Sequence, residues 1–218
     1  ADPPAQLDYD LWLGPAPFVR YQSNFLPSIW RWWHAFGTGD MGNDGVHDID
    51  IARWGLGVTR HPDRVAALGG KLFFDDDQQF PDTQYVAFEY DVGGKKKQLI
   101  YEHRIWSPYV QEGYENGAAF YGTEGILVIG HSVGWTLYGP RNKKLAERTG
   151  PADLPAHHQD FLDCIRGKSK QPAATAAVAL RHRDVAGAET TGPASRTAVA
   201  IAVTCTLLAS AVKRGPAS

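Results

Sequence analysis

The sequence predicts an α+β fold in which helices pack on one face of a mostly antiparallel open sheet. Apolar and polar residues alternate over much of 83–138, with the period of two that is typical of strands with one buried face. Glycines punctuate this stretch and divide it into short strands. Upstream of it, apolar residues recur at helical spacing after a glycine-rich segment, which predicts a helix packed on the sheet.

Length, composition and charge limit the classes of function. The 218 residues suffice for one domain, or for one domain and a fragment, and 43% hydrophobic residues are ordinary for a globular protein. The formal net charge is −2, so no basic field indicates binding to nucleic acid or to an anionic membrane. The first residues lack the pattern of a signal peptide, which favours a cytoplasmic protein, with a periplasmic one as the alternative.

The beginning of the chain is rich in proline and aromatic residues. Residues 1–8 are expected to be a linker or a truncated start, and the short apolar segment that follows ends at Gly-Pro-Ala-Pro, 14–17. Among the aromatic residues of 18–36, Trp30 has two interpretations. It forms a wall for a sugar ring, because indole faces stack well on apolar C–H faces, or it plugs the core.

The segment 37–57 carries the candidate catalytic side chains. One stripe of the predicted helix contains four residues at i, i+4, i+7 and i+11: Asn43, His47, Asp50 and Trp54. The apolar residues on both sides of this stripe indicate a buried helix, whose polar groups then need partners or a function. The structural alternatives stay open: Asn43 as a helix cap, His47 as a satisfied core residue, and Asp50 as a partner of the backbone or of Arg53.

Other acidic residues are expected to be structural. Asp44 and Asp48 fall off the stripe, so we expect them to be first-turn acids that the helix dipole favours. Asp75, Asp76 and Asp77 are adjacent in a loop and lack the spacing of a calcium site, which indicates a solvated cluster.

The sheet is predicted to have about five strands. The expected strands lie near 83–90, 98–106, 118–121, 126–129 and 135–138. Between the second and the third, the long polar loop 107–117 carries Tyr109 and Tyr114 as candidates for substrate binding. Residues 140–156 are expected to be another loop.

Two segments close the chain. A helix is predicted over 157–166, with Phe161, Leu162 and Ile165 toward the core. Residues 171–218 form an alanine-rich tail with a predicted terminal helix over 197–212. Its 16 residues are fewer than the roughly 20 that span a bilayer, so a buried helix is favoured and a membrane anchor is the alternative.

Six segments resemble the C-terminal half of the Gfo/Idh/MocA oxidoreductases, the relatives of glucose-fructose oxidoreductase and inositol dehydrogenase. They are YDLWLGPAP, GTGDMGNDGVHDIDIARWGLG, FFDDDQ, RIWSPY, ENGAAFYGTEG and HHQDFLDCIRGK, which begin at residues 9, 37, 73, 104, 115 and 157. The resemblance implies a substrate domain over 9–170 whose open sheet often dimerises, so a homo-oligomer is expected. In the family, a preceding Rossmann domain binds NAD(P) and supplies a lysine from a Glu-Lys-Pro turn.

The resemblance also implies a reaction. Hydride would pass from a sugar or polyol carbinol to a nicotinamide, with His47 as the base and Asn43 as the residue that orients it or the substrate. Asp50 would fix the His47 tautomer. Substrate contacts would come from Trp30, Asp50, Trp54, Tyr109 and Tyr114.

The sequence departs from the family in three ways. No GxGxxG follows a predicted strand and no Glu-Lys-Pro occurs, so we expect no NAD(P) site on this chain and no activity without a nucleotide-binding domain. Asn43 stands where many members have aspartate, in a GN-x-x-x-H pattern that some subfamilies share. Residues from 171 onward match poorly.

Two other classes of function are open. A non-catalytic carbohydrate-binding or oligomerisation module is the main alternative, because the nucleotide-binding half is missing. A metal hydrolase would recruit His34, His47, Asp50 or His61, but no HExxH or comparable spacing occurs, and no metal is expected.

Overall fold

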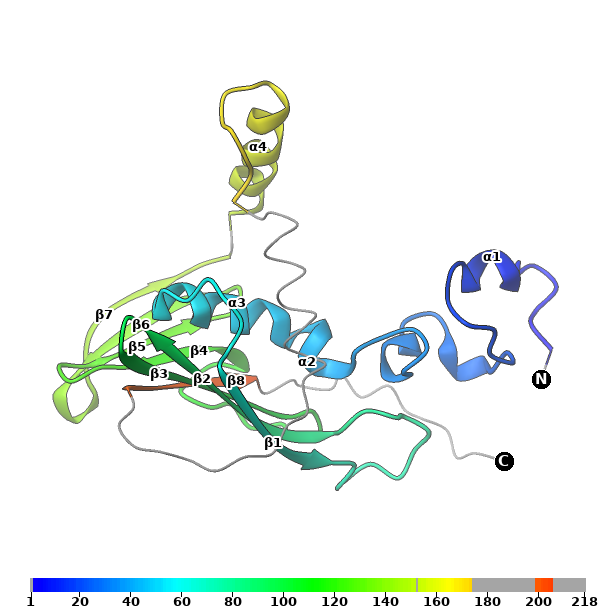
Figure 1. Cartoon of the computed structure of the whole chain (residues 1–218), viewed down its shortest axis with the longest axis horizontal. Helices are drawn as coiled ribbons and strands as arrows, with labels where there is room; N and C mark the ends of the chain where they lie inside the picture. Colours follow the sequence, from blue (N-terminus) through cyan, green and yellow to red (C-terminus); the bar gives the residue numbers. More distant parts are fainter. Residues whose placement is uncertain (1, 152, 174–198, 206–218) are drawn as a thin grey trace.

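A computed structural model describes residues 2–151, 153–173 and 199–205, and it confirms the α+β class. In these residues, the strands form one eight-stranded sheet in the order β1-β2-β3-β8-β4-β5-β6-β7, and α3 lies across one face (Figure 1). The strands are β1 (Arg64–Gly70), β2 (Thr83–Val92), β3 (Lys95–Arg104), β4 (Asn116–Tyr121), β5 (Ile126–Gly130), β6 (Gly134–Gly139), β7 (Lys143–Thr149) and β8 (Val199–Cys205). The helices are α1 (Tyr9–Leu13), α2 (Gly39–Asn43), α3 (Gly45–Leu56) and α4 (Leu154–Ile165), with short 3₁₀ turns η1 (Ser23–Phe25), η2 (Ile29–Trp32) and η3 (Pro140–Asn142).

Two antiparallel meanders make up most of the sheet. Strands β1, β2 and β3 form one, and β4 to β7 form the other. The register of the β2–β3 hairpin pairs Val86 with Tyr101 and Phe88 with Leu99, so the apolar alternation predicted for both strands falls on the same face. The predicted strands 118–121, 126–129 and 135–138 correspond to β4, β5 and β6.

The sequence prediction missed both edge strands. Strand β7 lies in the stretch predicted to be a loop, and all seven of its residues are exposed. Strand β1, at the other edge, is also mostly exposed. A strand that buries neither face carries no alternation of apolar and polar residues, so the period of two cannot reveal it.

Strand β8 joins the two meanders. It pairs parallel with β3 and antiparallel with β4. The terminal helix predicted over 197–212 is therefore wrong for 199–205, and the rest of that range lies outside the described residues. A short apolar run fits a buried strand as well as a buried helix, and the valines, isoleucine and threonine of VAIAVTC favour the strand.

Helix α4 is observed where a helix was predicted, but it does not pack on the sheet. Asp153 caps its N-terminus by accepting a hydrogen bond from the Ala156 amide at 3.0 Å. Phe161, Leu162 and Ile165 are exposed, and Figure 1 shows α4 standing away from the sheet. Their predicted direction toward the core is wrong in the described structure, because helical spacing defines an apolar side without showing that a surface exists to cover it.

The main core lies between α3 and the sheet. It is formed by apolar side chains from both layers: Met41, Ile49, Ala52, Leu56, Val58, Val86, Phe88, Tyr90, Leu99, Tyr101 and Ala118. At the first turn of α3 the layers come very close, since a Cβ added to Gly45 would lie 2.6 Å from the Tyr101 Oη. Beneath this contact, the Tyr101 hydroxyl lies 3.1 Å from the Nδ1 of buried His103. Burial lowers the pKa of His103 to about 4, so its imidazole is neutral at neutral pH.

A second core is aromatic and belongs to the first third of the chain. Phe25, Trp32, Trp33 and Ile105 are buried in it. Asp82 fixes the loop that packs against this core, because its carboxylate accepts hydrogen bonds from the amides of Leu72, Phe73 and Phe74 at 2.7–3.1 Å. Within the described residues, no helix is long and apolar enough to cross a membrane.

We predict that Gly45→Ala destabilises the fold. The new methyl group would overlap Tyr101 and push α3 away from the sheet, so the free energy of unfolding should fall by about 1–3 kcal/mol. Urea denaturation measures this change. Gly70→Ala is the control, because the added Cβ there meets only a Leu72 methyl group at 3.6 Å. Equal effects of the two substitutions would contradict the close seating of α3.

Candidate functional site

The site is built around the junction of α2 and α3. The helical path breaks at Asp44, which is the N-cap of α3 and makes no side-chain capping hydrogen bond. Asn43 is the last residue of α2, so the alternative in which it caps α3 is wrong. His47 lies in the first turn of α3, where its side chain is exposed.

A second histidine meets His47 from the sheet. His131 lies in the turn between β5 and β6, and its ring packs edge to face against that of His47, with centroids 4.9 Å apart and planes at 86°. The backbone N–H of His131 donates to the Asn116 carbonyl at 3.1 Å, which ties this turn to the start of β4. The sequence prediction did not include His131, because nothing in the GHSVG turn relates it to a helix more than 80 residues earlier.

Asp48 holds His131 in place. Its side chain is fully buried, and its Oδ1 accepts a hydrogen bond from the His131 Nδ1 at 3.0 Å. This hydrogen bond is the main cause that raises the pKa of His131, and the negative charges of Asp48 and Asp44 add to it against the opposing effect of burial.

Asp48 is a first-turn acid of α3, as predicted, but its side chain is buried. It lies on the same side of α3 as Gly45 and Ala52, three residues before and four residues after it, and all three are buried. That side of the helix faces the sheet, so the carboxylate is directed toward the β5–β6 turn.

Asp40 is a second buried acid beside the site. It is 1% exposed, and neither carboxyl oxygen has a hydrogen-bond partner in the described part of the chain. Burial is the main cause that raises the pKa of Asp40 to about 8; the charges of Asp44 and Asp48 contribute to this rise, and Arg31 opposes it. At neutral pH this group is therefore a neutral carboxylic acid in the folded protein.

The structure places the remaining predicted residues in different surroundings. On α3, Asp50 is half-buried and Trp54 is 65% exposed. Tyr109 is exposed on the loop after β3. The Tyr114 hydroxyl lies 2.9 Å from the Thr136 Oγ1, and its ring covers Gly130.

Tyr114 lies on the sheet face opposite α3. Phe120 contacts Gly55 of α3 and pairs with Leu127, so both are on the α3 face. The next residue, Val128, pairs with Thr136, and these two are on the opposite face by the alternation of strand side chains. The sheet therefore lies between Tyr114 and His47, and a substrate contact of Tyr114 stays a prediction.

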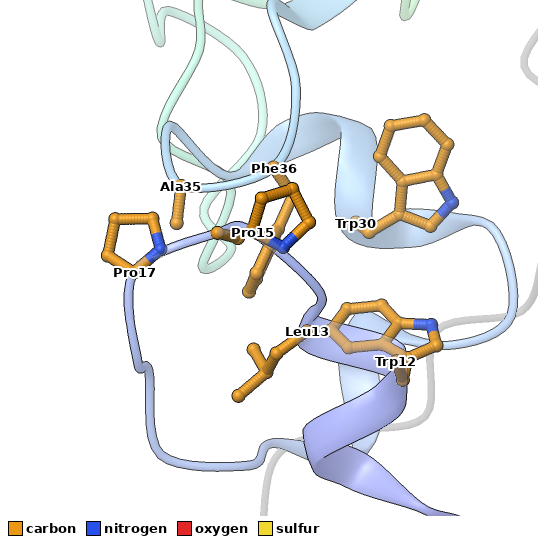
Figure 2. A pocket seen from close by; sticks show the side chains of 8 residues that line it. Trp12, Leu13, Pro15, Pro17, Trp30, Ala35 and Phe36 are labelled. Atoms are coloured by element: carbon orange, nitrogen blue, oxygen red, sulfur yellow. The ribbon is translucent and has the colours of Figure 1, made fainter.

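Trp30 lines a cavity of about 580 Å³ that includes neither His47 nor His131. Its lining is apolar throughout: Trp12, Leu13, Pro15, Ala16, Pro17, Trp30, Ala35 and Phe36. Figure 2 shows Trp12 and Trp30 approaching the same space from α1 and η2, and Figure 1 shows α1 standing apart from the sheet. Trp30 is 37% exposed and so does not plug the core.

The candidates for a metal site are not brought together. Within 2–151 and 153–173, no group of three or more His, Cys, Asp or Glu side chains is arranged to hold a metal ion. His34 instead packs its ring against Phe80, with centroids 4.2 Å apart.

Comparison with known proteins finds a family model that matches nearly the first half of the chain. Residues 1–95 match the model of an oxidoreductase family, specifically its C-terminal alpha/beta domain. No curated protein matches the sequence.

Solved structures resemble the fold. A protein from Klebsiella pneumoniae assigned as an oxidoreductase aligns with a TM-score of 0.52 at 16% identity, over 68% of this chain and 46% of that one. UDP-N-acetylglucosamine 3-dehydrogenase from Acidithiobacillus ferrooxidans aligns with a TM-score of 0.46 at 16% identity, over 76% and 48%. A protein from Bacteroides fragilis assigned as an oxidoreductase aligns with a TM-score of 0.45 at 19% identity, over 71% and 51%. The chain spans about half the length of these structures.

We predict that Asp40 makes stability depend on pH. Its pKa in the folded protein, about 8, exceeds its ordinary value of 3.8, so its contribution is complete below pH 3.8 and is lost as the pH rises toward 8. The free energy of unfolding should fall by up to about 1.4 kcal/mol per pH unit in this window. Asp40→Asn, which imitates the protonated acid, should be more stable than the wild type at pH 7 and should flatten the dependence.

Denaturant unfolding at pH 5, 6, 7 and 8 measures this dependence. Asp10→Asn, at an exposed position of α1, is the matched control and should leave it unchanged. A wild-type stability that stays constant over this range would show that Asp40 is ionised in the folded protein.

Proposed function

We propose that this chain, whose residues 1–95 match the C-terminal domain of the Gfo/Idh/MocA oxidoreductase family, is the substrate-binding and catalytic half of an NAD(P)-dependent oxidoreductase that acts on a sugar or polyol hydroxyl. The observation that supports this proposal is the exposed imidazole of His47 on the first turn of α3, with a second imidazole against it. Oxidation of a carbinol needs a base for the hydroxyl proton, and an imidazole is suited to that role near neutral pH.

The described residues do not fit the nicotinamide cofactor itself. A dinucleotide site places its pyrophosphate on free amides at a helix N-terminus. Here α3 begins at Asp44 with Asp48 in its first turn, and α4 begins at Asp153, so both longer helices put negative charge where a phosphate would bind. We therefore assign hydride acceptance to a cofactor held by another domain, and proton acceptance to His47 of this chain.

The other predicted residues divide between two regions. Trp54 shares the stripe of His47 on α3, and Asn43 ends the preceding helix α2; we assign these two side chains to substrate orientation, together with Asp50. Tyr109 is exposed on a loop, so a substrate contact remains a prediction for it.

A non-catalytic binding role has one observation in its favour. The cavity between Trp12 and Trp30 offers two indoles but no polar side chain. A sugar could stack there, but its hydroxyl groups would have few partners, so this cavity supports the alternative less well than the α3 stripe supports catalysis. Self-association through the sheet face opposite α3 also remains a prediction. Tyr85 is partly exposed on that face, while Tyr114 and its loop cover part of it.

We predict that His47→Ala inactivates the enzyme without unfolding it. In the protein complete with its nucleotide-binding domain, kcat for NAD(P)⁺ reduction by a panel of sugars and polyols should fall by about 10²–10⁴-fold. The melting temperature should change little, because the side chain is exposed. His158→Ala, an exposed histidine on α4, is the matched control and should keep full activity. Full activity of His47→Ala would remove His47 from the mechanism.

We also predict that the isolated 218-residue chain does not bind NAD⁺ or NADP⁺ with micromolar affinity. The physical reason is the acidic start of its longer helices, which repels a pyrophosphate. Isothermal titration calorimetry measures this directly. A micromolar dissociation constant would overturn the assignment of the cofactor to another domain.

A further inference from the structure

We propose that Asp48 and His131 form an ion pair that positions the His47 ring and keeps its imidazole free to accept the substrate proton. This proposal rests on the proposed function, since it assigns His131 a role in the same site. His131 acts through His47 and is therefore a positioning residue.

The first argument is the need of a buried carboxylate for a partner. Asp48 is fully buried, and its Oδ2 has no hydrogen-bond partner within the described residues. The His131 Nδ1 at 3.0 Å is the contact that compensates its charge. A buried carboxylate is costly without a cation or several donors, so the folded structure favours an imidazolium at His131 over a neutral ring.

The second argument is the geometry of the two rings. The His131 side chain is 26% exposed and lies edge to face with His47 at 4.9 Å, in a contact that joins the sheet to α3. Because the Asp48 hydrogen bond fixes the His131 ring, the neighbouring His47 ring has a defined surface to pack on. The position of His47 is thus set from the sheet as well as from its own helix.

The third argument is the distribution of charge around His131. The groups that act on it are the carboxylates of Asp48 and Asp44, both from the start of α3, and the imidazole of His47. Both carboxylates favour a proton on His131. Two imidazolium ions about 5 Å apart repel one another, so a proton held on His131 disfavours a second one on His47. These charges favour a proton on His131 over one on His47, which leaves the His47 imidazole to act as the base.

Two substitutions separate this role from simple packing. His131→Asn places an amide nitrogen near the position of the Nδ1, so it can keep the hydrogen bond to Asp48 but cannot carry charge. Asp48→Asn removes the negative charge and keeps the size of the side chain. In the 218-residue chain, NMR titration of the histidine ring signals needs neither substrate nor cofactor.

We expect Asp48→Asn to move the titration of His131 to lower pH. His131→Asn should move the titration of His47 to higher pH, with folding retained. In the complete protein, the acidic limb of the pH–rate profile should move upward in His131→Asn by the same amount. His158→Asn, on α4, should change neither titration nor profile.

The outcomes distinguish this proposal from the proposed function. If His131→Asn folds and leaves both the His47 titration and the pH–rate profile unchanged, the pair only ties the β5–β6 turn to α3, and the proposal is wrong. If Asp48→Asn leaves the His131 titration unchanged, the proposal is also wrong. If the titrations move as expected but His47→Ala keeps full activity, the coupling is real and the proposed function has failed.

Discussion

The contact between Gly45 and Tyr101 is the constraint on which the rest of the site depends. No side chain larger than hydrogen fits at the start of α3, so the helix lies directly on the ring of a buried strand residue. This seating brings Asp48 within reach of the β5–β6 turn and sets His47 at the rim of the same contact. Because Gly45 is held against the sheet, the first turn of α3 places the Asp48 carboxylate at a fixed distance from the sheet.

Three buried carboxyl groups show three ways of meeting the cost of burial. Asp82 is compensated by backbone amides, and these hydrogen bonds together lower its pKa although burial alone would raise it. Asp48 is compensated by an imidazole. Asp40 has no partner in the described structure and is neutral instead. The first arrangement fixes a loop, whereas the other two lie at the junction of α2 and α3, where Asp40 makes the charge depend on pH.

The sequence predicts those parts of the fold and the site that depend on residues close together in the chain. It does not predict contacts between residues that are far apart in the chain. The β2–β3 hairpin followed from alternation and a Gly-Gly turn, and α3 followed from helical spacing. The edge strand β7 has no buried face to mark it, and β8 is an apolar run that fits either structure. The contact between Asp48 and His131 joins residues 83 positions apart, and a single sequence contains no signal for such a pair. The one sequence signal that Asp48 faces inward is its helical spacing with Gly45 and Ala52, and the prediction of a first-turn acid did not use it.

The central place of β8 has a consequence for how the chain folds. Each meander is made of hairpins whose strands are close in sequence, so each can form early from local contacts. The strand between them pairs Lys97 with Val199, which requires closing a loop of about 100 residues before any pairing energy is gained. Completion of the sheet should therefore be the slow step of folding. Until it occurs, β3 and β4 present open inner edges that can pair with another copy of the chain, so aggregation should compete with folding at high concentration.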